Sequence, residues 1–384
     1  MELGPGEVLS PAEVLGLRMG SLLLRDDDPG RPKDVAGVVS WFGAMQAQDN
    51  GSALWSLGVR LPHLDLAGVK EALERKEALR TWPMRGTVHL VSPRDARWML
   101  DLMGVRALAG ATARRASLGI DERTADRAVD VLGSTLAGKR LTRAQCLAAL
   151  TEAGIDIGGQ AGYHLLWYAS QRGVICIAPH VGTEQTFALL GEWVPDPWLP
   201  SREEALATIA IRYFRSHGPT TRQDFAGWTG LTATDAKAGI AAAGDALTSA
   251  TAGGTEVYLT PEALDTAPRD ATGYLTLPGF DEYLLGFKDR SLMVSDGHKQ
   301  AIIPGGNGVF QPTVVRAGRV VATWKRTMTT KLAKIQVHEL AKLTAKDRTA
   351  IEAAFDPYGR FLGFPVSLTF LEHSLRSGAG KIGR

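Results

Sequence analysis

The chain has 384 residues, of which 45% are hydrophobic and 22% are charged, and its formal net charge at pH 7 is +2. This length exceeds one ordinary hydrophobic core and predicts roughly two to four domains. The composition is ordinary for a globular protein, no apolar run is long enough to span a membrane, and the near-zero total charge does not decide for or against a nucleic-acid partner.

The N-terminus and the cysteines predict a cytoplasmic protein. Residues 1–11 are acidic and lack the basic-then-apolar order of a secretory signal. Cys146 and Cys176 lie in apolar contexts, so we expect buried thiols in a reducing compartment. Neither a metal-ligand spacing nor a Walker-type glycine-rich loop is present in the sequence. We therefore predict no metal, no cofactor and no membrane association.

The first structural unit is predicted over residues 1–115. Ser10-Pro11-Ala12-Glu13 is a favourable helix start, with proline in the first turn. The apolar spacing predicts helices over 12–24, 34–43 and 66–76, and strands over 79–82 and 87–91. Met45 to Asn50 form a joint between the second helix and the next apolar stretch.

The second unit, residues 116–195, repeats this order. A helix over 122–136 is stopped by Gly138, and Thr142 begins the next helix. A third helix carries Tyr163 to Tyr168, and strands are expected over 174–177 and 186–189.

The third unit, residues 196–270, is the clearest copy. Ser201 caps a helix whose first turn is acidic, Thr220 or Thr221 caps a short helix, and Thr232 begins a third. Two short strands follow, near 247–250 and over 257–259. Three helices followed by a β-hairpin are typical of a winged helix, which usually binds DNA but also serves in protein-protein scaffolds.

The last part of the chain, residues 271–384, alternates like β structure and is predicted to be a β-rich cap. The fold class is therefore predicted to be α+β, with tandem winged-helix units followed by this β-rich part. Tandem copies of such a unit can curve into a channel that would suit a duplex.

Gln46 and Gln48 are the most informative pair in the sequence. Two amides two residues apart do not share a helix face, but they point the same way in an extended segment. Together they could hold a water, a phosphate or a base edge. Amides are not strong acids or bases, so a reaction catalysed by this pair must proceed without strong acid or base catalysis.

Basic residues gather near the predicted hairpins. The segment 316–334 contains no acidic residue and six basic ones, which are Arg316, Arg319, Lys325, Arg326, Lys331 and Lys334. Such a run can be a solvated face, but its place beside β-hairpins favours a groove that follows phosphates. We predict DNA contacts by Arg319, Lys325 and Arg326 from this segment and by Arg80 and Arg85 from the first hairpin.

Three further candidates have competing structural explanations. His89 could contact a phosphate or could be a half-buried strand histidine. Gly306 and Asn307 could form the tip of a hairpin that enters the minor groove, or they could form an ordinary tight turn.

Four segments together resemble the AlkZ-type winged-helix DNA glycosylases, over about residues 10–375. The segments are Met45 to Asp49, Arg80 to Leu90, Gly279 to Arg290 and Pro304 to Phe310. The resemblance implies a C-shaped arrangement of the tandem units around DNA. It also implies excision of alkylated purines, including bulky N7-alkylguanine adducts, and some members act on interstrand crosslinks. Several members accompany gene clusters for DNA-alkylating natural products and protect the producer.

The family's catalytic signature assigns the reaction to Gln46 and Gln48. A glutamine at the third position of the signature marks the AlkZ-like branch, whereas an aspartate marks the YcaQ-like branch. The chemistry fits these residue types independently, because N7 alkylation makes guanine a cationic leaving group. Cleavage through an oxocarbenium-like sugar then needs only a positioned water and dipolar stabilisation. Neighbouring Asp49 could add electrostatic help.

We therefore predict a DNA glycosylase that acts on double-stranded DNA bearing alkylated bases, as a cytoplasmic, nucleoid-associated monomer. No lysine stands out as a lyase nucleophile, so the enzyme is expected to be monofunctional. The alternatives are a non-catalytic tandem winged-helix DNA-binding protein, such as a transcription regulator, and a protein-interaction scaffold. No heptad or dimer stripe of the kind that regulators use is visible.

Overall fold

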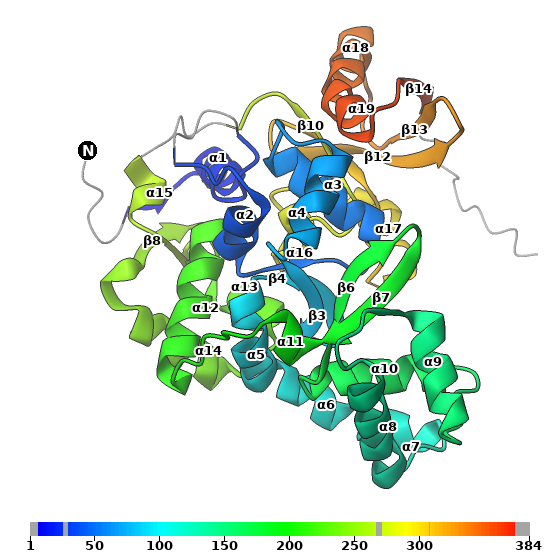
Figure 1. The fold of residues 1–384 in the computed structure, drawn as a ribbon. Coiled ribbons are helices and arrows are strands. Elements are labelled where there is room, and N and C mark those ends of the chain that lie inside the picture. The colour runs from blue at the N-terminus through cyan, green and yellow to red at the C-terminus, as the bar shows by residue number, and fades with distance from the viewer. Residues whose placement is uncertain (1–6, 26–29, 266–270, 307, 373–384) are drawn as a thin grey trace, which may run out of the picture.

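Three β-sheets with helices packed around them organise the chain (Figure 1). The computed structural model describes residues 7–25, 30–265, 271–306 and 308–372. None of the helices in these ranges is long and apolar enough to cross a membrane. Both cysteines are free and buried, as predicted.

The largest sheet joins the hairpins of the first two predicted units. Its strand order is β2-β4-β3-β6-β7-β5, with bounds β2 Ala44–Gln46, β3 Leu79–Met84, β4 Thr87–Val91, β5 Leu141–Thr142, β6 Ile175–Val181 and β7 Glu184–Leu189. The two hairpins meet where Arg80 of β3 lies opposite Ile177 of β6. They were expected to be separate wings, and one short antiparallel contact makes them a continuous surface.

Helices of the first two units cover this sheet, and their starts follow local capping rules. Ser10 and Thr142 form capping boxes with Glu13 and Gln145. The helices are α1 Pro11–Ser21, α2 Val35–Phe42, α3 Asn50–Arg60, α4 Leu66–Glu74, α5 Ala96–Met99, α6 Val105–Gly110, α7 Thr112–Ser117, α8 Glu122–Thr135, α9 Arg143–Glu152, α10 Ala161–Gln171 and α11 Leu190–Trp193. Trp55 and Trp82 are buried in the core.

The third unit begins with α12, Arg202–His217, capped by Ser201. It continues with α13 Arg222–Thr229, α14 Ala233–Ala243, β8 Thr248–Ala252, β9 Thr255–Leu259 and α15 Glu262–Asp265. Strand β1, Val8–Leu9, runs parallel to β8. Val14 and Leu17 of α1 pack with Leu259 of β9 in a small core of their own. The start of the chain therefore packs on the third unit as well as on the first.

The C-terminal part contains both the expected sheet and helices that the strand-like alternation did not reveal. Its sheet has β10 Tyr274–Leu277, β11 Thr313–Arg316, β12 Arg319–Met328, β13 Ala333–Glu339 and β14 Val366–Leu371. Its helices are α16 Glu282–Leu285, α17 Lys299–Ile302, α18 Ala345–Ala354 and α19 Asp356–Leu362. In Figure 1, α18 and α19 lie at the opposite end of the molecule from α7 and α8.

A buried ion pair fixes this C-terminal part to helix α3. Arg60 and Asp281 form two parallel hydrogen bonds, from Nη1 to Oδ2 at 2.8 Å and from Nη2 to Oδ1 at 3.0 Å. Ser56 also donates to Oδ2 of Asp281 at 2.7 Å, and both charged side chains are at most 3% exposed. The Lys288 main-chain N–H, six residues further on than Glu282, donates to Asp224 of α13 at 2.7 Å.

The ion pair gives a stability prediction. Asp281→Ala leaves the Arg60 guanidinium buried without its counter-charge, so we expect a loss of about 3–5 kcal/mol in the free energy of unfolding. Urea denaturation followed by tryptophan fluorescence measures this loss. Asp101→Ala is the control, because Asp101 and Arg97 form an exposed pair that should contribute about 1 kcal/mol or less. Equal losses in the two variants would contradict a structural role for the buried pair.

Candidate functional site

The segment that carries the two glutamines was predicted to be extended throughout, but the strand ends at Gln46 and Gln48 lies in the bend that precedes α3. Gln46 ends strand β2 and lies opposite His89 of β4. The Ala47 N–H donates to the Val88 carbonyl at 2.8 Å, and the Val88 N–H donates to Oε1 of Gln48 at 3.2 Å. The side-chain carbonyl of Gln48 is therefore held by the neighbouring strand, and its amide nitrogen makes no hydrogen bond to any described residue.

The two glutamines differ in exposure. Gln46 is 8% exposed, whereas Gln48 is exposed. Within the described ranges, no side-chain hydrogen bond involves the Gln46 amide, and its main-chain N–H donates to Glu282 at 2.8 Å. Asp49 follows directly, and its carboxylate accepts from the Ser52 N–H at 2.7 Å. Asp49 therefore acts as the N-cap of α3, a role that explains its position without any catalytic function.

Gln48 opens into a cavity of about 690 Å³ between the first two units. The cavity is lined by β3 and β4 on one side and by α9, α10, β6 and β7 on the other. Its polar lining residues are Gln48, Asn50, Arg80, Arg143, Tyr163, His180, Thr183, Glu184 and Gln185. Gln46 does not line it, although Ala47 and Val88 do.

Arg80 is a buried cation in this cavity wall. It is 5% exposed, and its guanidinium donates to Asn50 Oδ1 at 2.7 Å and contacts His180 Nδ1 at 2.8 Å. No carboxylate pairs with Arg80 in the part of the chain that the structure describes. Burial lowers the pKa of Arg80 to about 10, so it remains charged at neutral pH. An unpaired buried cation is costly, and it makes the cavity a favourable place for an anion.

His180 is neutral beside this cation. Burial, together with the charges of Arg80 and Lys70, lowers the pKa of His180 to about 4. Its Nδ1 accepts from Arg80, because a guanidinium can only donate. Nε2 of His180 then carries the hydrogen and is a donor in the cavity wall. Sequence reasoning did not select His180, Asn50 or Arg143, because these residues meet through contacts between the two units, such as the pairing of β3 with β6, that are distant in the sequence.

His89 is fully buried and does not lie on a free surface. Its Nε2 is 3.2 Å from Nη2 of Arg85, and its Nδ1 is 2.9 Å from the Thr87 carbonyl. Burial and the charge of Arg85 lower the pKa of His89 to about 3, so the ring is neutral. This geometry matches a structural strand histidine better than a phosphate contact. Arg85 itself is exposed at the turn between β3 and β4, with a φ of 55°.

The basic strand β12 carries three candidate residues, Arg319, Lys325 and Arg326, and Arg326 lies close to the start of α3. Arg326 donates to the Tyr358 hydroxyl at 2.6 Å, and a methyl group on Gly51 would lie 3.5 Å from its Nη2. Lys325 is adjacent in the strand and therefore points to the opposite face, where it lines a separate cavity with His338. Only Arg326 of this pair lies beside the start of α3.

The remaining candidates are placed less favourably. Arg319 is exposed near the turn between β11 and β12, and a methyl group on its neighbour Gly318 would lie 3.2 Å from Leu15 of α1. Gly306 belongs to a short 3-10 turn after α17, with a φ of 63°, and not to a hairpin tip. Asn307 lies outside the described residues.

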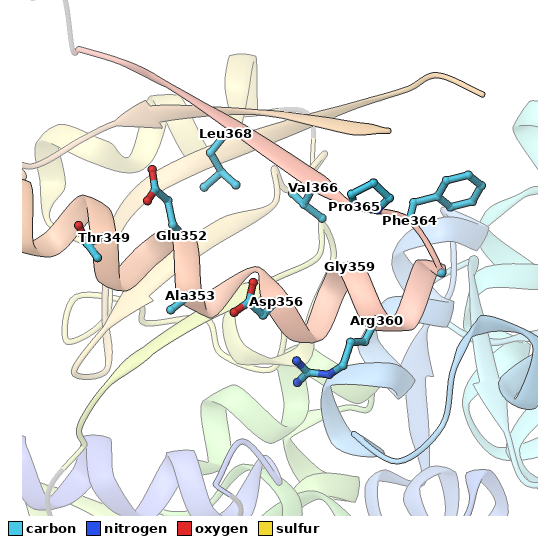
Figure 2. A pocket seen from close by; sticks show the side chains of 11 residues that line it. Thr349, Glu352, Ala353, Asp356, Gly359, Arg360, Phe364, Pro365, Val366 and Leu368 are labelled. Atoms are coloured by element: carbon cyan, nitrogen blue, oxygen red, sulfur yellow. The ribbon is translucent and has the colours of Figure 1, made fainter. Parts of the chain in front are cut away.

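A second cavity, of about 910 Å³, lies between α18, α19 and β14. Figure 2 shows Glu352, Asp356 and Arg360 on the helical side and Val366 and Leu368 on the strand. The three charged side chains are exposed to solvent. None of them is enclosed as Arg80 is, so this cavity lacks the shielded, unpaired charge that distinguishes the one beside Gln48.

Comparison with known proteins identifies the family of this chain. The family model described as "DNA glycosylase AlkZ-like" matches residues 39–361. An "Interstrand DNA cross-link repair glycosylase" of Streptomyces sahachiroi is 27% identical over 312 residues, which cover 78% of this chain and 84% of that protein. The solved structure of Streptomyces sahachiroi DNA glycosylase AlkZ superposes with a TM-score of 0.77 at 25% identity, covering 94% of this chain and 100% of that one. The chain therefore belongs to the AlkZ-like DNA glycosylase family.

Proposed function

We propose that this protein is a monofunctional DNA glycosylase that releases N7-alkylated guanine and related cationic purines from duplex DNA. The observation that carries the proposal is the position of Gln48, exposed at the rim of a basic cavity and held by the main chain of β4. The Streptomyces sahachiroi relative is named for interstrand cross-link repair, and we extend our proposal to bulky adducts and cross-links of the same cationic kind.

The proposed reaction relies on the charge of the leaving base. N7 alkylation places a positive charge on guanine, and this charge is neutralised when the glycosidic bond breaks. A carbonyl oxygen of Gln46 or Gln48 can accept from the attacking water, while the other amide orients it. The developing sugar cation is stabilised by these dipoles. Water adds to C1′ and its proton passes to solvent, which leaves an abasic site and the free alkylated base.

The surrounding charges support duplex binding. Arg80, Arg143 and His180 offer donors in the cavity wall, and a backbone phosphate would supply the anion that buried Arg80 lacks. Arg326 lies near Gly51, in the first turn of α3 that follows the glutamine segment. We propose that the helix and hairpin units are tandem winged helices curved around the duplex in a C-shape, and that the protein works as a monomer in the cytoplasm.

The two glutamines can be tested by substitution. With duplex DNA containing N7-methylguanine under single-turnover conditions, Gln46→Ala or Gln48→Ala should slow base release about 10- to 1000-fold, because each removes a positioned polar group. High-performance liquid chromatography of the free base measures the rate. Gln300→Ala is the matched control, since Gln300 is an exposed amide on α17. Tight binding of intact duplex without any base release by the unsubstituted protein would favour a non-catalytic DNA-binding protein.

Strand β12 offers a second test with its own control. Arg326→Ala should weaken duplex binding and reduce the slope of log K against log salt by about one, as expected for the loss of one phosphate contact. Lys325→Ala removes the same charge from the opposite face of the strand and should change the slope less. Fluorescence anisotropy over a salt series measures both slopes. Equal slopes in the two variants would contradict the assignment of the Arg326 face to DNA.

A further inference from the structure

A buried carboxylate from a distant part of the chain holds the main chain of Gln46. Glu282 is the first residue of α16 and is 1% exposed. Its Oε1 accepts the Gln46 N–H at 2.8 Å across 236 residues of sequence. Strand β2 is the edge of its sheet, and this N–H faces away from the neighbouring strand. Glu282 therefore supplies the acceptor that a further strand would otherwise provide.

The second oxygen of Glu282 is also held. Oε2 accepts from Trp228 Nε1 at 2.9 Å and lies 3.3 Å from His217 Nε2. Burial by itself raises the pKa of Glu282, but hydrogen bonds from His217 and from the Gln46 main chain outweigh it, and the pKa falls to about 2. Since an ionised carboxylate only accepts, His217 Nε2 carries the hydrogen.

Aromatic rings lock this arrangement. His217 stacks on Tyr213 with ring centroids 4.6 Å apart and planes 16° apart. Three further rings surround it, those of Phe42, Trp228 and Phe287. A methyl group on Gly286 would lie 2.1 Å from Cδ2 of His217, so the imidazole packs directly on the main chain of α16. The packed His217 and Trp228 rings therefore hold Oε2 of Glu282, while Oε1 accepts from Gln46.

Resting on the proposed function, we propose that Glu282 is a positioning residue for glycosidic bond cleavage. By accepting the Gln46 N–H it fixes the segment from which Gln46 and Gln48 reach the substrate. Trp228 and His217 support it from the other side and do not touch the substrate. The contact is part of the ground-state structure, so its loss displaces both amides without removing either of them.

Glu282→Gln tests the proposal, because it preserves shape but places an NH₂ group against one of the donors. We expect kcat for N7-methylguanine release to fall about 10- to 100-fold, as for a misplacement on the order of 1 Å, while duplex affinity stays unchanged. Glu339→Gln is the matched control. Glu339 is also a buried carboxylate, but it pairs with Arg348 and does not touch Gln46.

A double-mutant cycle separates positioning from general destabilisation. In a Gln46→Ala background, Glu282→Gln should cost less than in the unsubstituted protein, because only the Gln48 amide remains to be displaced and coupled residues are not additive. Trp228→Phe is the second variant, for use if Glu282→Gln fails to fold. It removes one hydrogen bond to Oε2 and keeps an aromatic ring, so it should give an intermediate loss of kcat. Full additivity in the cycle, or an unchanged kcat in both variants, would overturn the proposal.

Hydrogen exchange tests whether Glu282 holds the Gln46 amide, and it does not require the proposed activity. Mass spectrometry of a peptide covering residues 44–48, without DNA, should show faster exchange of the Gln46 amide in Glu282→Gln and no change in Glu339→Gln. If the unsubstituted protein releases no base, the proposed function fails, and the exchange experiment still decides whether Glu282 holds the strand. Unchanged exchange in Glu282→Gln would refute the positioning role by itself.

Discussion

Two consecutive buried carboxylates, Asp281 and Glu282, join the C-terminal part of the chain to the segment that carries the glutamines. Asp281 pairs with Arg60 at the end of α3, and Glu282 accepts from Gln46 at the end of β2. Strand β2 precedes α3 in the chain, so Glu282 holds the strand just before the turn that contains Gln48, and Asp281 holds the far end of the helix that follows it. Burial makes each contact strong and also makes the loss of either partner costly.

This constraint explains how weakly reactive groups can form a site. An amide cannot transfer a proton as an acid or base does, so its usefulness depends on where it is held. The main chain of β4 and the side-chain carboxylate of Glu282 hold the segment here, and the cavity beside Gln48 adds a cation in Arg80 that lacks an acidic partner among the described residues. A cationic base that departs as a neutral molecule needs no stronger catalyst, and ordinary bases lack that charge.

Local signals in the sequence predicted much of the fold. The capping boxes at Ser201 and Thr142 and the alternating strands of the hairpins depend on neighbours a few residues away, and the elements appear where these signals place them. The capping box of α18, from Thr344 to Asp347, was equally local. It was overlooked because strand-like alternation dominates that part of the chain.

The parts that could not be predicted depend on contacts between distant segments. The first two hairpins pair at Arg80 and Ile177, and the cavity lies between the two units that these hairpins belong to. The role of Glu282 depends on a partner 236 residues away. Its one sequence signal was an acidic pair inside the otherwise apolar run Gly279 to Phe287, which indicates burial. Gln46 and Gln48 were selected from their spacing and from the family resemblance, but the spacing did not reveal that one is buried and the other exposed.

The most direct test of this account varies the charge of the leaving base and leaves the protein unchanged. Single-turnover release should be compared for duplexes that contain N7-methylguanine, a cationic lesion, and 1,N6-ethenoadenine, a neutral one, in the same sequence. The account predicts release of the cationic base and no detectable release of the neutral base. Comparable release of both, with the same dependence on Gln46 and Gln48, would show that the protein supplies the activation itself and would contradict the account.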